Sequence, residues 1–111
     1  MQPNTAIHAA ALALTHEPVP AAQSVAGAPS TAASTLAQFG GLEIGVWEMS
    51  VGTMTDVEAD EVFVVLSGAA TVEFADGTAP LHLRADDIGR LAAGAETTWT
   101  VTDTLRKIYL T

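Results

Sequence analysis

The sequence predicts an all-β domain, either a sandwich or a barrel. From residue 40 onward no segment shows a helical period. Instead, short runs of β-branched and aromatic residues alternate with turn residues at intervals of roughly 8 to 12 residues. The length of 111 residues fits one domain with one core.

Composition excludes several classes of function. The chain has 13 acidic and 4 basic residues, giving a net charge of −9, so nucleic acid and anionic membranes are poor partners. No apolar run approaches the roughly 20 residues of a membrane helix. Cysteine is absent, which excludes disulfides, thiolate metal sites and cysteine nucleophiles. A reducing compartment fits this composition, and we expect a cytoplasmic protein.

Residues 1–38 are predicted to form an N-terminal arm. The segment is rich in Ala, Ser, Thr, Pro and Gln and contains no Lys or Arg. A secretory signal needs a positively charged start, which this segment lacks. Residues 6–14 could form a short helix or an edge strand. We expect the arm to be partly extended, to lie across a sheet and to contribute to a homodimer interface.

The first predicted strand covers residues 42–49. Its apolar side chains fall on both faces, with Ile44 and Val46 on one and Trp47 and Met49 on the other. Both faces therefore need cover, which favours the homodimer.

The central stretch of the chain is predicted to be a buried strand at residues 61–66, closed by a turn at Ser67-Gly68. Four carboxylates precede or open it: Asp56, Glu58, Asp60 and Glu61. We expect these to form a solvated acidic loop.

Further strands are predicted over 71–74, 81–83, 88–91, 97–101 and 105–110. Asp76-Gly77 indicates a tight hairpin turn, because both central positions of that turn need positive φ. Asp86-Asp87 indicates another turn.

The spacing of these residues resembles that of small cupins related to ureidoglycine aminohydrolase. The resemblance spans about residues 40–110 and rests on Gly-Val-Trp-Glu at 45–48, Gly52, Asp60-Glu61, Gly68, Asp76-Gly77, Asp87, Gly94, Trp99-Thr100-Val101 and Arg106-Lys107-Ile108-Tyr109. It implies a double-stranded β-helix, the cupin jelly-roll barrel, over residues 39–111. It also implies a binding site at the barrel mouth and a homodimer.

Metal-binding cupins carry three histidines and a glutamate, and the resemblance locates their positions here. The glutamate falls on Glu61. The histidine positions fall on Thr55 and Val57, or Met54 and Asp56, and on Thr97. We therefore expect no transition metal and no cofactor. A weak oxygen-ligand site at the four carboxylates stays open, although they lack the glycine-bearing loop of calcium sites. His8, His16 and His82 each lack a second ligand nearby.

Glu61 is the candidate catalytic residue. It alternates with Phe63 and Val65, so an inward-facing strand places its carboxyl group in an apolar cavity, where desolvation raises a pKa. Alternatively, Glu61 is a structural acceptor held by Thr hydroxyls, Tyr109 or Lys107. The candidate ligand-binding residues are Trp47, Phe63, Thr97, Trp99 and Tyr109. For both tryptophans, core packing is the alternative.

Three functions remain open. The first is a metal-independent cupin that binds a small polar, nitrogen-containing organic molecule. The second is a hydrolase, lyase or isomerase of such a molecule, with Glu61 as acid or base. The third is a structural module with a filled barrel. No nucleophile elbow, P-loop or dinucleotide fingerprint is present.

Overall fold

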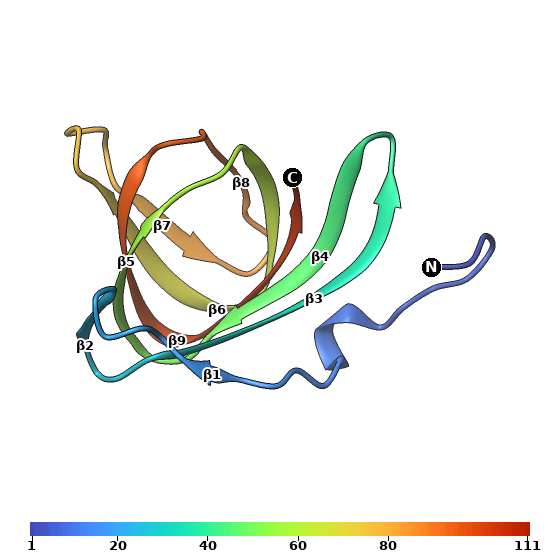
Figure 1. Cartoon of the computed structure of the whole chain (residues 1–111), viewed down its shortest axis with the longest axis horizontal. Helices are drawn as coiled ribbons and strands as arrows, with labels where there is room; N and C mark the ends of the chain where they lie inside the picture. The colour runs from blue at the N-terminus through green and yellow to red at the C-terminus, as the bar shows by residue number, and fades with distance from the viewer.

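A computed structural model describes all residues, 1–111, and shows one antiparallel sheet curled into a barrel (Figure 1). The predicted cupin jelly-roll fold is confirmed. The elements are η1 (Ala9–Ala11), β1 (Glu17–Pro18), β2 (Ser24–Ala26), β3 (Ser30–Phe39), β4 (Leu42–Met49), β5 (Gly52–Val57), β6 (Glu61–Phe74), β7 (Leu81–Arg84), β8 (Ile88–Leu91) and β9 (Glu96–Leu110).

The two longest strands, β6 and β9, form the frame of the barrel. They pair with each other over almost their whole length. On its other edge, β9 pairs with β5 through its first half and with β4 through its second half. The other edge of β6 pairs with β8 and then β7. Each long strand therefore joins two short ones, and this curls the sheet around a central space.

The predicted break at Ser67-Gly68 is wrong, because β6 continues through it. Gly68 adopts φ of +90°, and the register against β9 shifts on both sides of it, as in a β-bulge. The bulge reverses the alternation of side chains: Phe63 and Val65 are buried before it, and Ala70 and Val72 after it. One strand thus supplies inward-facing residues to both ends of the barrel.

Other boundaries also differ from the prediction. The segments 97–101 and 105–110 belong to one strand, β9, because register with β5, β4 and β6 carries it through Asp103. Part of the expected acidic loop is strand β5, whose backbone pairs with β9. Asp76-Gly77 lies in the β6–β7 connection, but this connection is a longer loop in which Asp76 accepts a hydrogen bond from the Thr78 N–H (2.9 Å).

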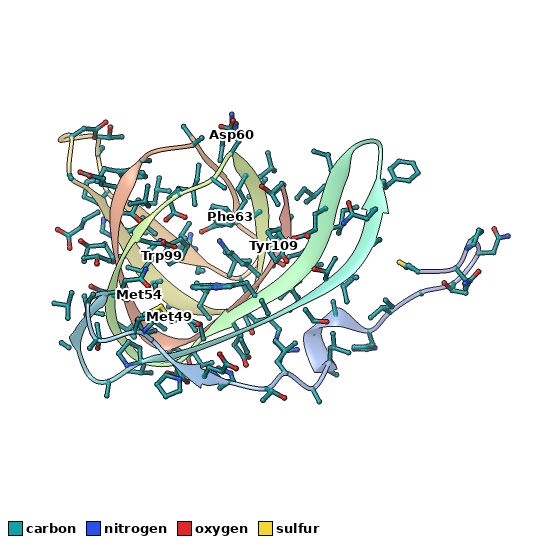
Figure 2. The ribbon with its side chains drawn as sticks, in the orientation of Figure 1. Met49, Met54, Asp60, Phe63, Trp99 and Tyr109 are labelled. Carbon is teal, nitrogen blue, oxygen red and sulfur yellow. The ribbon has the colours of Figure 1, made fainter.

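The core fills the barrel below its mouth. It comprises Val19, Met49, Met54, Phe63, Val65, Ala70, Val72, Leu83, Leu91, Trp99, Val101 and Leu105. Figure 2 shows Met49 and Met54 near one end of this interior and Phe63 and Trp99 further along it. Burial of these side chains is the main favourable contribution to the stability of a chain without disulfides. No helix in the structure has the length and apolarity needed to cross a membrane.

The N-terminal segment is fastened to the outside of the barrel. Arg106 donates hydrogen bonds through Nη1 to the carbonyls of Ala9 (2.9 Å) and Leu12 (2.7 Å), and through Nε to Glu48 (3.1 Å). The imidazole of His16 contacts the other Glu48 oxygen (2.6 Å). Burial opposes ionisation of Glu48, but the bonds from His16 and Arg106 outweigh it and lower its pKa. The expected boundary at residue 38 lies within β3.

Gly68 provides a test of the bulge. A Cβ added there would lie 2.6 Å from Leu105 Cα and against the carbonyl of Thr104. We expect Gly68→Ala to lower the free energy of unfolding by about 3 kcal/mol or more, because left-handed strain and a backbone clash add. Gly77→Ala is the control, since Gly77 has a similar φ (+86°) but an open environment. Equal losses for both variants, measured by urea denaturation, would contradict this account.

Candidate functional site

A cavity of about 200 Å³ opens at the mouth of the barrel. Its lining residues are Ala33, Trp47, Asp56, Glu58, Ala59, Glu61, Trp99, Lys107, Tyr109 and Thr111. They come from β3, β4, β5, β6, β9 and the segments beside them. Figure 2 shows Phe63, Trp99 and Tyr109 directed to the barrel interior, whereas Asp60 lies at the rim of the loop before β6.

The ion pair between Lys107 and Glu61 lies in the wall of this cavity. Lys107 Nζ is 2.5 Å from Glu61 Oε2, and the two side chains are only 5% and 14% exposed. The pair joins the neighbouring strands β9 and β6 on the inner side of the sheet. Three aromatic rings also surround the ammonium group, with centroids 4.7 Å (Phe63), 4.8 Å (Trp47) and 4.9 Å (Trp99) from Nζ. Charge pairing and cation–π attraction thus both hold the side chain of Lys107 in this position.

Glu58 is the second inward carboxyl group. Its Oε2 accepts hydrogen bonds from Thr97 Oγ1 (2.6 Å) and from Trp99 Nε1 (2.9 Å). Both donors are neutral and buried, at 4% and 2% exposed. Asp56 lies nearby on β5, and its pKa is raised by burial first and by the negative charge of Glu58 second. Neither Glu58 nor Asp56 pairs with a cation in the structure.

Tyr109 lies on the side of the cavity nearest the β3–β4 hairpin. Its hydroxyl donates a hydrogen bond to Glu43 (3.1 Å). Burial raises the pKa of Tyr109 most, and the hydrogen bond and the charge of Glu43 raise it further, against a smaller opposing effect of Thr35. A second hollow of about 360 Å³ adjoins the first and shares Asp56 with it. Carboxyl groups therefore line both hollows at the mouth of the barrel.

The structure brings together four of the residues predicted for the site: Trp47, Glu61, Trp99 and Tyr109 line one cavity. Phe63 is not part of the lining of this cavity, but its ring centroid lies 4.7 Å from Lys107 Nζ. Thr97 lines the adjoining hollow and holds Glu58.

Sequence reasoning missed three residues of the site. Asp56 and Glu58 were assigned to a solvated loop, and Lys107 was considered only as one of several partners for Glu61. The alternation of β9 could have revealed Lys107, since it shares the parity of Trp99 and Val101. Asp60 alone among the four carboxylates lies at an exposed position, paired with Arg90 (3.3 Å; side chains 70% and 60% exposed).

The residues present do not suit the transition metal that many cupins hold. Glu61, the one matching ligand, is bound by an ammonium group, and positive charge at that point opposes a cation. Thr55 and Val57 are exposed, and Thr97 offers only a hydroxyl group, which is engaged by Glu58. No group of three or more His, Asp or Glu side chains is arranged to hold a metal ion.

The curled antiparallel sheet with a cavity at its mouth has the architecture of a cupin barrel. A family profile described as the EutQ-like cupin domain matches residues 36–109, so the chain belongs to the EutQ-like cupin family. The predicted superfamily is confirmed. The narrower relation to ureidoglycine aminohydrolase stays a prediction. No curated protein sequence matches the chain.

Several solved structures share the fold. A Salmonella typhimurium LT2 protein described as ethanolamine utilization protein Q is 15% identical, with a TM-score of 0.62 over 73% of this chain and 68% of that chain. The EutQ protein of Clostridium difficile is 19% identical, with a TM-score of 0.63 over 74% and 67%. A Pseudomonas syringae pv. tomato protein of unknown function is 22% identical, with a TM-score of 0.70 over 90% and 44%. At these identities the likeness concerns the fold.

Removing the ammonium group should destabilise the barrel. We expect Lys107→Met to lower the free energy of unfolding by about 3–5 kcal/mol, because it leaves Glu61 charged, buried and unpaired. Adding Glu61→Gln should recover part of this loss, since it removes the stranded charge. Arg90→Met, which breaks the exposed pair with Asp60, should cost less than about 1 kcal/mol. Urea denaturation measures all four chains, and a double variant no more stable than Lys107→Met would refute the coupling.

Proposed function

We propose that this protein is a metal-independent EutQ-like cupin that binds a small polar, nitrogen-containing organic molecule in the cavity at the barrel mouth. The observation that carries the proposal is the charge of the cavity lining. Asp56, Glu58 and Glu61 contribute three carboxyl groups, whereas Lys107 is the only cation and is already paired with Glu61.

Asp56 and Glu58, which pair with no cation, favour a ligand that donates hydrogen bonds. Glu58 is held by two neutral donors, and Asp56 has a raised pKa, so both would gain from a ligand that brings N–H groups or positive charge. Trp47 adds an aromatic wall suited to a flat or cationic group. An amine, amide or ureido compound combines these features.

A binding protein is favoured over an enzyme that uses Glu61 as acid or base. The carboxylate of Glu61 is already in contact with an ammonium group, so it is not free to exchange a proton with a ligand. A filled structural barrel is disfavoured by the cavity itself. A cytoplasmic location stays a prediction.

Thermal unfolding with small probes tests the ligand class. We expect ethylammonium, acetamide or N-methylurea at millimolar concentrations to raise the unfolding midpoint, because a ligand that binds only the folded state stabilises it. Glu58→Gln should weaken the apparent affinity about tenfold or more. Glu73→Gln is the control, since it removes the same charge from an exposed position on β6. Stabilisation by none of the probes, or equal binding to both variants, would reject the proposal.

We further propose that the protein is a homodimer formed through the outer face of β4, β9, β6 and β8. On this face Phe39, Leu42, Val62 and Ile88 are 78%, 44%, 40% and 74% exposed. Cross-strand pairing aligns Phe39 with Leu42, and Val62 with Leu110, on the side opposite the cavity. The edge of β3 beyond Thr31 also lacks a partner strand and carries no charge or proline.

A second copy of the chain fits this face because its large exposed side chains are apolar. The exposed cation on β8, Arg90, is paired with Asp60. Elsewhere the net charge of −9 makes two copies repel one another. Figure 1 shows the β3–β4 hairpin projecting beside the barrel. The tip of this hairpin carries the exposed side chains of Phe39 and Leu42. Contiguous exposed apolar area of this kind marks interfaces.

Light scattering with size-exclusion chromatography measures the assembly. We expect the wild-type chain at tens of micromolar to have twice the monomer mass and Ile88→Glu to be monomeric, since a buried unpaired charge opposes association. Val25→Glu makes the same change at an exposed position on β2, away from this face, and should remain dimeric. A monomeric wild type would disprove this interface.

A further inference from the structure

The surroundings of Lys107 Nζ form a cage for an ammonium group. Rings from three strands, Trp47 on β4, Phe63 on β6 and Trp99 on β9, lie with their centroids between 4.7 and 4.9 Å from Nζ. Trp47 and Trp99 meet edge to face at a centroid distance of 5.4 Å, which fixes the angle between two walls. Glu61 supplies a carboxylate 2.5 Å from the nitrogen. We call these four residues the ammonium cage.

The chemistry of the cage is that of a binding site for an organic cation. Aromatic faces carry negative potential and attract ammonium ions, most strongly where water is excluded. A carboxylate adds full charge and a charge-assisted hydrogen bond, which distinguishes a protonated primary amine from a neutral group of the same shape. The cage contains the carboxylate that matches the metal ligand of other cupins, so an organic cation is bound where the fold commonly holds an inorganic one.

We propose that the interior of this barrel is a binding site for a primary alkylammonium ion, and that its resident occupant is the side chain of Lys107. The inference does not depend on the ligand proposed for the cavity at the barrel mouth, although Trp47, Glu61, Trp99 and Lys107 also line that cavity. It predicts that the cage binds a free alkylammonium ion as well as the ammonium group of Lys107, which is covalently attached to β9.

Truncation of Lys107 separates the cage from its occupant. Lys107→Ala removes three carbons and the ammonium nitrogen, and n-propylammonium consists of the same heavy atoms. This ion can fill the vacated volume, restore the pair with Glu61 and place its charge between the rings. 1-Propanol has nearly the same size and shape but no charge, so it separates recognition of the cation from the filling of a cavity.

The experiment compares wild type and Lys107→Ala by thermal unfolding in n-propylammonium chloride, with potassium chloride at equal ionic strength as the reference. We expect a saturable rise in the midpoint of Lys107→Ala that exceeds the rise in wild type by about 4 °C or more, because the wild-type cage is occupied by Lys107. Trp47 and Trp99 are the only two tryptophans, so their fluorescence should change over the same concentration range. 1-Propanol should give neither effect.

Two further variants identify the site. Glu61→Gln/Lys107→Ala should lose the response, because the cage then lacks its carboxylate. Lys107→Met should also lack it, because the methionine side chain fills the cage. If Lys107→Ala is unfolded in buffer, recovery of circular dichroism on adding n-propylammonium, but not 1-propanol, is the supporting result. A response that potassium chloride or 1-propanol reproduces, or no response from Lys107→Ala folded or unfolded, overturns the proposal.

Discussion

The pairing of Lys107 with Glu61 is the interaction on which the barrel mouth depends. Removing two charges from water is costly, and it is tolerated only where each charge has a close partner and further favourable contacts. Here the partner is at 2.5 Å, and three rings face the ammonium group. Because these groups come from β4, β6 and β9, satisfying one cation requires three strands to converge.

The pairing of Lys107 with Glu61 also determines the charge of the cavity whose wall contains the pair. Alternation along β9 directs Thr97, Trp99, Lys107 and Tyr109 inward, so one strand supplies the donors for Glu58, an aromatic wall and the cation. Since Lys107 is already engaged by Glu61, the remaining carboxyl groups give the opening its negative character. The acidity of the chain is therefore partly internal, and not only a property of its solvated surface.

Local sequence patterns predicted the all-β class, and the resemblance to small cupins added the jelly-roll barrel. The β-branched and aromatic runs around Phe63 and Trp99 identified the strands that frame the barrel, and the period of two correctly placed Glu61 on the inward side. The bulge at Gly68 could not be predicted, because a glycine after a strand indicates a turn equally well. Only pairing with β9, distant in sequence, decides between them.

The site was harder to predict than the fold. Four nearby acidic residues are typical of a solvated loop, and no local pattern shows that β9 pairs with β5 and turns Asp56 and Glu58 toward the interior. Lys107 was inconspicuous for a similar reason, since a lysine near the end of a strand usually reaches solvent. Its burial follows from Trp47 and Phe63, which lie far from it in sequence.

The adjacent residues Arg106 and Lys107 point to opposite sides of β9, the first holding the arm by two carbonyls and Glu48, the second holding Glu61. The two cations therefore bind partners on opposite faces of the same strand. Sliding β9 by a single position would exchange them, sending the guanidinium toward the tryptophans and the ammonium toward the arm. Both charges would then lose their partners, so the Arg106-Lys107 dipeptide disfavours any barrel in which β9 is shifted by one residue.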